Sequence, residues 1–460
     1  MRVAIVGSGP AGFYAAEHLL KQEDRAIEVD MYDRLPTPFG LVRAGVAPDH
    51  PKIKSVIRIY EKTAGRPGFR FFGNVEIGKD LSVADLGARY HAVIYAYGTP
   101  TDRTLGIPGE DLPGSHAATE FVAWYNAHPD FTDREFDLSA KCAVVIGNGN
   151  VAADVARMLA LTREELEETD TADHAIDELA DSGIEEIVVL GRRGPAQAAF
   201  TNPEVRELGE MIDADIVIDP ADCELDDVSR EWIESDDADP TNRRNVEIFT
   251  GFSVRGPEGK RKRIVLRFCF SPIEIRGNGK VESIVIGRNE LRREGGAIRA
   301  ADSGDREEIE CGLVLRSIGY KGIGIDGLPF DEGRGTIPNE RGRVIDGPGG
   351  EQIPGQYVVG WIKRGPSGVI GTNKKDALDT VNALLEDLDA GLVPQPAGDT
   401  SAEGAETLVA ERAPDFVSFG GWHAIDAAEV GRGEPLGRPR VKFPTVDEML
   451  EAAREHARTS

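Results

Sequence analysis

The sequence predicts an α/β fold with two domains of the same kind, each a parallel β-sheet covered by helices. One observation behind this prediction is a glycine-rich turn at residues 7–12, between a short apolar run and a stretch of apolar residues at helical spacing. The other is a turn of the same form at residues 147–152, which lies 147 − 7 = 140 residues further along. A repeat at this distance indicates a duplicated domain, because solenoid repeats recur at about 20 to 50 residues. The chain has 460 residues, enough for both domains.

The first turn belongs to a strand–helix–strand unit. Residues 3–6 form a short apolar run, which is typical of a parallel strand buried on both faces. The helix follows the turn, and residues 27–32 form the second strand, which ends at Asp33. The context therefore fits the dinucleotide-binding fingerprint, with a strand before the glycines, a helix after them and an acid at the end of the next strand.

The glycines of this turn have separate steric roles. Gly7 permits the tight bend, Gly9 lets a pyrophosphate approach the backbone, and Gly12 lets the helix pack closely against the strand. The N-terminus of the helix supplies N–H donors and a partial positive charge to the phosphates. Asp33 then accepts hydrogen bonds from the ribose hydroxyls, and a glycine turn without a ligand is the structural alternative.

The second turn differs in a way that favours a different dinucleotide. A strand at 142–146, a helix at 151–161 and a strand at 187–190 repeat the pattern, but the acid is replaced by Arg192 and Arg193. Carboxylates at this point would repel a 2′-phosphate, whereas guanidinium groups bind it through charge-assisted hydrogen bonds. The second site is therefore predicted to take NADPH, with a solvated arginine loop as the structural alternative.

Two dinucleotide sites, one ending on an acid and one on arginines, imply hydride transfer between NADPH and FAD. Closing strands that end on glycine are predicted at 92–98 and 313–319, followed by a Gly/Pro-rich region, a strand at 357–361 and a helix at 373–388. Residues 392–404 are predicted to form a surface loop or linker.

The simplest topology inserts the second domain into a discontinuous first domain, with chain crossings near 106–108 and 321–322. The predicted architecture is thus a pair of Rossmann-like domains of glutathione-reductase type. We expect an FAD-binding domain formed by 1–106 and by 322–460, which includes a C-terminal extension, and an NADP-binding domain formed by 107–321.

Composition excludes several other functions. The net charge of −27 argues against general nucleic-acid binding and against docking on anionic lipid. No apolar run approaches the roughly 18 residues of a membrane helix, and the first strand directly after Met1 predicts a cytoplasmic protein without a leader. Cys142, Cys223, Cys269 and Cys311 form no C-x-x-C motif and fit no zinc or iron–sulfur spacing, so no metal site is expected.

Two long motifs carry a family resemblance. Residues 36–52 read PTPFGLVRAGVAPDHPK, and residues 360–374 read GWIKRGPSGVIGTNK. With both fingerprints, these motifs resemble the adrenodoxin-reductase type of ferredoxin–NADP⁺ reductase, over residues 3 to about 450. The resemblance implies an enzyme that transfers a hydride from NADPH to N5 of FAD and then passes single electrons to a small ferredoxin-type iron–sulfur protein. A monomer or weak dimer is expected.

The resemblance also implies site residues. For FAD, it adds Ala11, Leu41, Ile77, Trp361, Gly368, Val369 and Ile370 to Gly7, Gly9, Gly12 and Asp33. For NADP, it implies Asn148, Gly149, Asn150, Val151, Arg192, Arg193, Glu204 and Gly368, with Arg103 as a further nucleotide contact. Position 33 is Asp where the family commonly has Glu, which shortens the reach to the ribose.

His50 and Glu207 resemble a pair that handles protons or positions the nicotinamide in this family. Each also has a structural explanation from sequence. His50 precedes Pro51, as a turn or helix cap does, and Thr201-x-x-Glu204 has the form of a capping box at the start of the helix that carries Glu207.

An acidic reductase needs a local basic patch to bind an acidic ferredoxin. Arg243 and Arg244 are our candidates, since basic residues of the second domain serve this role in the family. Further basic residues lie at 260–263 with Arg267, and at Arg288, Arg292 and Arg293. Two other functions remain open, a flavin monooxygenase and a non-catalytic nucleotide sensor. A thioredoxin-reductase type is disfavoured by the missing C-x-x-C.

Overall fold

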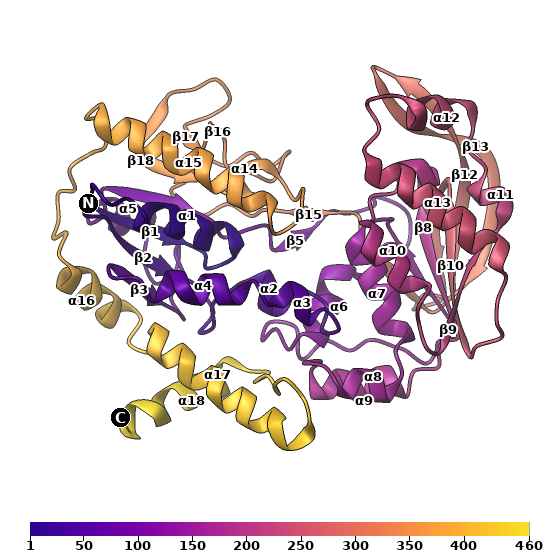
Figure 1. Ribbon diagram of the computed structural model, residues 1–460, viewed down its shortest axis with the longest axis horizontal. Coiled ribbons are helices and arrows are strands. Elements are labelled where there is room, and N and C mark those ends of the chain that lie inside the picture. The colour runs from indigo at the N-terminus through magenta and orange to yellow at the C-terminus, as the bar shows by residue number, and fades with distance from the viewer. Residues whose placement is uncertain (460) are drawn as a thin grey trace. The chain divides into compact units, whose positions relative to one another are not determined.

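The computed structural model describes the backbone of residues 1–459 and the side chains of residues 1–455. It forms two compact units, and Figure 1 labels the elements of both. Unit 1 contains Met1–Val46, His50–Arg103 and the described residues from Gly319 onward, and unit 2 contains Ala47–Asp49 and Thr104–Ile318. Unit 2 is therefore inserted into unit 1 along the chain. The predicted fold class, with one domain inserted into another, is confirmed.

Unit 1 is built on a seven-stranded sheet in the order β16-β17-β18-β4-β1-β2-β3. The five strands from β18 to β3 are parallel, and β16 and β17 are added antiparallel at the β18 edge. The strands are β1 (Arg2–Val6), β2 (Glu28–Tyr32), β3 (Phe69–Phe72), β4 (Ala92–Tyr95), β16 (Asn339–Glu340), β17 (Arg343–Ile345) and β18 (Gln352–Val358).

The central strand β1 explains why its apolar run is continuous. Val3, Ala4 and Ile5 have no solvent exposure, because side chains pack against both faces of the sheet. Val3 and Ile5 join the cluster that includes α1 and α15, while Ala4 and Val6 join the cluster on the other face.

The helices of unit 1 cover this sheet and continue into a C-terminal extension. α1 and α15 lie side by side over one face (Figure 1). In chain order they are α1 (Pro10–Leu20), α2 (Leu41–Ala44), α3 (Pro51–Lys54), α4 (Ile57–Ala64), α5 (Val83–Gly87), α14 (Trp361–Arg364), α15 (Thr372–Asp389), α16 (Ala402–Arg412), α17 (Phe419–Gly433), the short 3₁₀ helix η2 (Glu434–Leu436) and α18 (Val446–Thr459).

Unit 2 contains a six-stranded parallel sheet in the order β6-β14-β7-β8-β10-β9. A separate antiparallel sheet, β11-β12-β13, packs its apolar side chains with β7, β8 and β14. The strands are β6 (Ser115–Ala117), β7 (Cys142–Ile146), β8 (Glu186–Gly191), β9 (Ala214–Ile218), β10 (Lys262–Phe268), β11 (Phe270–Arg276), β12 (Ser283–Glu294), β13 (Ala297–Glu310) and β14 (Leu313–Arg316).

The other face of the six-stranded sheet packs against helices, of which α7 lies directly after the second glycine turn. The helices of unit 2 are α6 (Ala118–Tyr125), α7 (Asn150–Ala160), α8 (Arg163–Glu167), α9 (Asp173–Ala180), the 3₁₀ helix η1 (Pro195–Gln197), α10 (Asn202–Leu208), α11 (Pro220–Cys223), α12 (Asp227–Glu234) and α13 (Pro240–Arg255).

A short ribbon in unit 1 holds the points where the chain leaves and returns. β5 (Thr101–Asp102) pairs antiparallel with β15 (Tyr320–Lys321), and the Arg103 N–H donates to the Gly319 carbonyl at 3.0 Å. The boundaries between the units therefore lie at 103/104 and 318/319, close to the expected crossings near 106–108 and 321–322.

Several predicted strands end at other residues. β4 ends at Tyr95 and β14 at Arg316, each three residues before the glycine that was expected to end it. Both glycines, Gly98 and Gly319, have positive φ (+74° and +105°), which takes the backbone out of the extended conformation. The bounds of the strand expected at 357–361 are wrong. The observed strand β18 ends at Val358, and Trp361 begins the helix α14. The loop expected at 392–404 gives way to α16 at Ala402.

In the part of the chain that the structure describes, no helix is both long enough and apolar enough to cross a membrane. The four cysteines are free, and burial raises the pKa of each thiol above its ordinary value.

Candidate functional site

The glycine turn of unit 1 has the steric properties predicted for a dinucleotide fingerprint. Gly7 has φ +106°, and a Cβ there would lie 2.6 Å from the Ala96 backbone. A Cβ on Gly12 would lie 2.2 Å from the Gly7 carbonyl oxygen, whereas a Cβ on Gly9 would meet nothing within 4 Å. Gly7 and Gly12 are thus required by the fold, and Gly9 faces open space at the N-terminus of α1, where a phosphate would lie.

Asp33 is directed at this turn. Its Oδ2 accepts hydrogen bonds from the Ser8 N–H (3.0 Å) and Ser8 Oγ (2.5 Å), and its Oδ1 accepts from the Leu35 N–H. The register of β1 and β2 pairs Val6 with Tyr32, which brings the ends of both strands to the same edge of the sheet. The carboxylate expected to bind the ribose therefore lies beside the glycine turn, held by Ser8.

A second segment lies on the same turn. The Phe39 N–H donates to the Ser8 carbonyl at 3.0 Å, and a Cβ on Gly40 would lie 3.0 Å from Gly9 Cα. Phe39 and Gly40 both have positive φ (84° and 49°), so the backbone here is strained at a non-glycine residue. Leu41 follows at the start of α2, and its side chain is 43% exposed.

The turn that carries Trp361 packs against the start of α1. Gly360 has φ +77°, and a Cβ there would lie 2.6 Å from Ala11 Cβ. The Gly360 N–H donates to Asp376 Oδ2 at 2.6 Å, which fixes the turn to α15. The Trp361 ring lies 5.2 Å from that of Tyr320, and its buried Nε1 has no hydrogen-bond partner among the described residues. A buried donor without a partner fits a ligand acceptor at this place.

The residues before α15 form a loop whose backbone is exposed. Gly368 has φ +79°, and a Cβ there would lie 2.5 Å from Thr372 Oγ1. Val369 is 56% exposed and donates its N–H to the same hydroxyl, while Ile370 packs against the core of unit 1. Ile77 is buried in the cluster on the opposite face of the sheet.

The glycine turn of unit 2 has the same geometry. Gly147 has φ +144°, and a Cβ there would lie 2.2 Å from the Ser317 carbonyl oxygen, whereas a Cβ on Gly149 would meet only Ala199 Cβ at 3.9 Å. Val151 lies in the first turn of α7. The buried Nδ2 of Asn148 has no hydrogen-bond partner among the residues described. A buried donor without a partner at this fingerprint fits a ligand acceptor, as for Trp361 Nε1 in unit 1.

The loop at residues 198–201 lies along this turn. The Ala199 N–H donates to the Asn148 carbonyl at 2.8 Å, and the Thr201 N–H donates to Asn150 Oδ1 at 2.8 Å. The start of α7 is therefore held to the segment that leads into α10.

Arg192 and Arg193 follow β8 as predicted. Burial and the neighbouring charge of Arg192 lower the pKa of the Arg193 guanidinium. In the part of the chain described, neither arginine has a carboxylate within ion-pair distance. The backbone is held instead, because Asn289 Nδ2 donates to the Arg192 carbonyl and the Cys269 N–H to the Arg193 carbonyl. Two adjacent cations without a counter-charge fit a dianionic 2′-phosphate.

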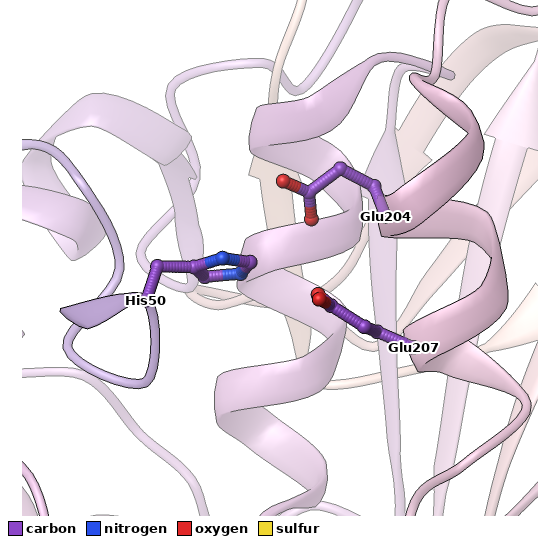
Figure 2. A group of neighbouring side chains, drawn as sticks. All are labelled: His50, Glu204 and Glu207. Carbon is purple, nitrogen blue, oxygen red and sulfur yellow. The ribbon is translucent and has the colours of Figure 1, made fainter. Parts of the chain in front are cut away.

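Glu204 and Glu207 project from α10, and His50 lies just before α3 (Figure 2). The capping box predicted from Thr201 and Glu204 is wrong, because the Thr201 side chain caps no helix N–H. Glu204 instead accepts from Arg157 at 2.9 Å, since a buried guanidinium offers it a charged partner that the helix end does not. His50 is 9% exposed, precedes α3 and makes no side-chain cap.

Arg157, on α7, gathers carboxylates from distant parts of the sequence. Its side chain is 4% exposed and contacts Asp49 (2.6 Å), Asp154 (2.8 Å), Glu204 (2.9 Å) and Glu207 (3.6 Å). Burial lowers the pKa of Arg157, but Asp49, Asp154 and Glu204 outweigh it and hold this pKa far above its ordinary value. Burial raises the pKa of Asp154, with the Arg157 charge opposing this and Glu204 and Asp49 adding to it. Arg157 therefore fixes both α10 glutamates and the residue that precedes His50.

Sequence reasoning missed Arg157, Asp376, Asn289 and Ser8. A signal existed for Arg157, which lies on the helix directly after the second fingerprint at a position otherwise surrounded by buried apolar residues. An arginine at such a position requires buried acidic partners. Asp376 and Asn289 act on backbone groups far away in the sequence, which leaves no local pattern.

The relatives and the solved structure that resemble this protein cover nearly the whole chain, and a family model covers its first part. The family model described as pyridine nucleotide-disulphide oxidoreductase matches residues 1–189. An NADPH-ferredoxin reductase of Mycobacterium leprae is 53% identical over 453 residues, which are 97% of this chain and 97% of that protein. The mitochondrial NADPH:adrenodoxin oxidoreductase of Salvelinus fontinalis is 41% identical over 463 residues, with coverages of 98% and 91%. The solved structure of Mycobacterium tuberculosis FprA in complex with NADPH has a TM-score of 0.92 at 50% identity, and the coverages are 98% and 99%.

Proposed function

Since the chain belongs to the adrenodoxin-reductase-type family of ferredoxin–NADP⁺ reductases, we propose that it carries electrons from NADPH through FAD to a ferredoxin-type iron–sulfur protein. It is an FAD-dependent oxidoreductase of the ferredoxin–NADP⁺ reductase type. When bound, FAD supplies a ring that accepts a hydride and releases electrons one at a time. The protein supplies the binding, the orientation and the charge around it.

We assign FAD to unit 1 and NADP(H) to unit 2. The single observation that carries this assignment is the contrast at the ends of the two fingerprints. In unit 1 the turn is closed by the Asp33 carboxylate at Ser8, whereas in unit 2 it is followed by Arg192 and Arg193 without counter-charges among the described residues. A carboxylate accepts ribose hydroxyls and repels a 2′-phosphate, and paired guanidinium groups do the reverse.

Residues of unit 1 would hold FAD at the carboxyl ends of β1 and β2. Gly9 and the N-terminus of α1 would bind the pyrophosphate, and Asp33 the ribose. Ala11, Leu41 and Ile77 would be further FAD contacts. Trp361 and the loop at 368–370 would form the wall around the isoalloxazine, where the orphaned Trp361 Nε1 would find its acceptor. The exposed backbone at the start of α15 would favour negative charge on the ring.

Residues of unit 2 would hold NADPH along the start of α7. Gly149, Asn150 and Val151 would bind the pyrophosphate, with Asn148 Nδ2 as an additional donor, and Arg192 with Arg193 would hold the 2′-phosphate. Glu204 belongs to the same proposed set. Arg103 and Gly368, in unit 1, are proposed as further nucleotide contacts.

His50 and Glu207 form our proposed proton-handling or nicotinamide-positioning pair. This proposal is supported by the ion pairs of Arg157, which fix the positions of neighbouring carboxylates. It holds Glu207 at 3.6 Å and Asp49 at 2.6 Å, and Asp49 directly precedes His50 in the chain. Hydride transfer itself needs no general acid, so the pair would act on protons and orientation.

We place the ferredoxin-docking surface of unit 1 at a basic groove. A cavity of about 330 Å³ is lined by Lys21, Arg58, Lys62, Arg66 and Lys374, with Tyr14 and Ile59 as apolar wall. Glu17 neutralises only Lys21 (2.5 Å), and the other four cations have no ion pair in the described part of the chain. In a protein of net charge −27, such a concentration of uncompensated positive charge suits an acidic partner.

The basic residues of unit 2 suit this role less well. Arg243 donates to the carbonyls of Ile233 and Ser235, and Arg244 pairs with Glu247. Arg267 pairs with Asp222 and Glu307. Because carboxylates already pair with Arg244 and Arg267, and backbone carbonyls hold the Arg243 side chain, we give the basic groove of unit 1 the larger share of the docking energy.

The proposal includes a cytoplasmic enzyme that works as a monomer or weak dimer. Four reduced cysteines suit a reducing compartment, and both fingerprints lie in one chain. The test of the proposed function is NADPH-dependent reduction of a ferredoxin by the flavin-loaded protein, followed through cytochrome c. We expect reduction that requires both FAD and the ferredoxin. Reduction at an equal rate without the ferredoxin would contradict the proposed acceptor.

A further inference from the structure

We infer that Glu429, on the C-terminal helix α17, is a positioning residue for the FAD-binding turn of unit 1. The inference rests on the proposed function, because it assumes that this turn binds FAD. It extends the site to the C-terminal extension. A chain of contacts leads from Glu429 to Arg43, then to the Phe39–Gly40 backbone, and then to Ser8 and Gly9.

Glu429 is an unusual residue for its place. It has no solvent exposure, and its two carboxylate oxygens accept from Arg43 at 2.8 and 2.5 Å. The Phe443 N–H donates to the same carboxylate at 3.0 Å, and Arg440 lies at 3.4 Å. Burial raises the pKa of Glu429, but the Arg43 and Arg440 charges and these hydrogen bonds bring it below its ordinary value. A buried glutamate thus binds the guanidinium of a buried arginine, which is 8% exposed, through two hydrogen bonds.

The C-terminal extension also binds the backbone of Arg43. Lys442 Nζ donates to the Arg43 carbonyl at 3.2 Å. On α17, Trp422 lies two turns before Glu429, and the Arg43 guanidinium lies 5.3 Å from the centroid of its ring. The Trp422 ring also meets the Phe39 ring edge-on at 5.5 Å. The C-terminal extension therefore contacts both ends of the segment from Phe39 to Arg43.

This segment is the one that lies on the glycine turn. The Phe39 N–H donates to the Ser8 carbonyl, and Gly40 approaches Gly9 so closely that a Cβ would lie 3.0 Å from Gly9 Cα. Phe39 has φ 84°, which a non-glycine residue holds only where its surroundings enforce it. Glu429 and Trp422 supply that enforcement through Arg43 and Phe39. Ser8, in turn, is the residue that donates twice to Asp33.

The sequence carries a signal for this role. The buried positions of α17 are Trp422, Ile425, Glu429 and Gly433, which recur at helical spacing. An acid in the middle of such a stripe does not serve packing, and its retention needs a specific cation. Arg43 lies 386 residues earlier in the chain, so the pair is visible only in the structure.

The test uses two variants. Glu429→Gln keeps the size of the side chain but removes its charge, and Arg43→Lys keeps an ion pair but loses the two-point geometry. We expect the dissociation constant for FAD to rise at least about tenfold in both, because a displaced turn no longer presents its donors in the bound geometry. In the FAD-free full-length protein, hydrogen exchange of the Phe39 amide, which bonds to Ser8, is expected to become faster.

The matched control is Asp387→Asn. Asp387 is another buried carboxylate on a helix of unit 1, 4% exposed, and it accepts from Arg343, Gln352 and Tyr357 near the far end of α15. Its loss is expected to lower the melting temperature while leaving FAD affinity within about twofold of the native value, since distant sites act independently.

Two results would overturn the inference. One is an unchanged FAD affinity and Phe39 exchange rate in both Glu429→Gln and Arg43→Lys. The other is an equal loss of FAD affinity in Asp387→Asn, which would make the effect one of general stability. A native protein that binds no FAD would refute the proposed function instead, and the Phe39 exchange rates would still decide whether Glu429 positions the turn.

Discussion

The guanidinium of Arg157 and the carboxylate of Glu204 lie 2.9 Å apart, and both side chains are almost completely buried. Arg157 comes from the helix after the second fingerprint, and Glu204 comes from α10. The same guanidinium holds Asp49 and Glu207. One arginine thus joins the dinucleotide-binding helix to the residues proposed to work beside the nicotinamide.

Replacing Arg157 should therefore impair both stability and hydride transfer. Arg157→Met leaves the buried Glu204 and the partly buried Asp49 and Asp154 without their cation, which costs about 3–5 kcal/mol of unfolding free energy. We also expect the rate of anaerobic flavin reduction by saturating NADPH to fall at least about tenfold, because the α10 glutamates lose their fixed geometry. Arg157→Lys should recover part of the rate.

Arg163→Met is the control for this experiment. Arg163 pairs with Asp177 and Asp181 at the surface of unit 2, where ion pairs contribute little. A flavin reduction rate in Arg157→Met equal to that of the Arg163 variant would contradict a positioning role.

The nucleotide preference should depend on Arg192 and Arg193. Each charge-assisted hydrogen bond to a phosphate contributes about 1.5–3 kcal/mol, so the double alanine variant should raise the KM for NADPH roughly 100-fold or more. The KM for NADH should change little, since NADH has no 2′-phosphate. Arg299→Ala, at the exposed strand β13, is the control. Equal changes for both nucleotides would show that the pair does not hold the 2′-phosphate.

FAD retention should depend on Asp33. Asp33→Ala removes the acceptor of the Ser8 hydrogen bonds and of the proposed ribose hydroxyls. We expect the FAD dissociation constant to rise roughly 100-fold or more, because two hydrogen bonds from the ribose hydroxyls to a charged group are lost. Asp33→Glu should bind FAD at least as tightly as the native protein. The measurement is flavin fluorescence on dilution, and unchanged retention in Asp33→Ala would count against the assignment.

The basic groove should govern ferredoxin affinity. With Arg58→Glu and Lys62→Glu combined, we expect the KM for ferredoxin to rise at least about tenfold at low salt and the difference to shrink at high salt, since exposed charges are screened. NADPH-dependent ferricyanide reduction should be unchanged. Arg243→Glu with Arg244→Glu provides the comparison. A stronger effect of that pair than of the groove variant would place docking on unit 2.

Lys262 should make a contribution to stability that grows with pH above 8. This residue is 2% exposed, donates to the Leu159 carbonyl and lies in the core of unit 2. Burial lowers its pKa to about 8, with the Arg261 charge adding and Asp213 opposing. Between pH 8 and the ordinary lysine pKa near 10.4, the unfolded chain holds the proton that the folded chain has released, so Lys262 should add about 1 kcal/mol per pH unit to the free energy of unfolding. The four buried thiols, whose pKa is raised, act in the opposite sense, so the Lys262 contribution is measured by difference.

Urea unfolding of the native protein and of Lys262→Met from pH 7 to pH 10 measures this contribution as the difference between their slopes. Lys262→Met should remove it, while Lys79→Met, at an exposed site, should leave it intact. The same slope in Lys262→Met would assign the effect to another group.

Much of the fold could be predicted from sequence, because the glycine turns and the residues that follow the strands depend on local backbone geometry. Gly7 and Gly147 need positive φ and leave no room for a side chain, so their turns stand out without any knowledge of distant residues. Asp33 and Arg192 could be identified because each directly follows the second strand of a strand–helix–strand unit, where the fingerprint places the residue that contacts the ribose. The fold class followed from the repetition of that unit.

Long-range partners account for what the sequence did not reveal. Thr201 and Glu204 have the spacing of a capping box. Glu204 pairs instead with Arg157, which lies 47 residues earlier in the chain, because Arg157 is a charged and buried partner. Glu429 and Arg43 are joined only after the C-terminal extension folds against α2. Trp361 opens a helix, since Gly360 with positive φ ends the extended backbone that its apolar neighbours favour.

Anaerobic rapid mixing of the FAD-loaded protein with NADPH and, separately, with NADH tests the central claim most directly. The contrast between Asp33 and the arginine pair predicts bleaching of the flavin absorbance by NADPH at concentrations far below those needed of NADH, followed by recovery when oxidised ferredoxin is added. Equal bleaching by both nucleotides at equal concentrations, or no bleaching by either, would contradict the account.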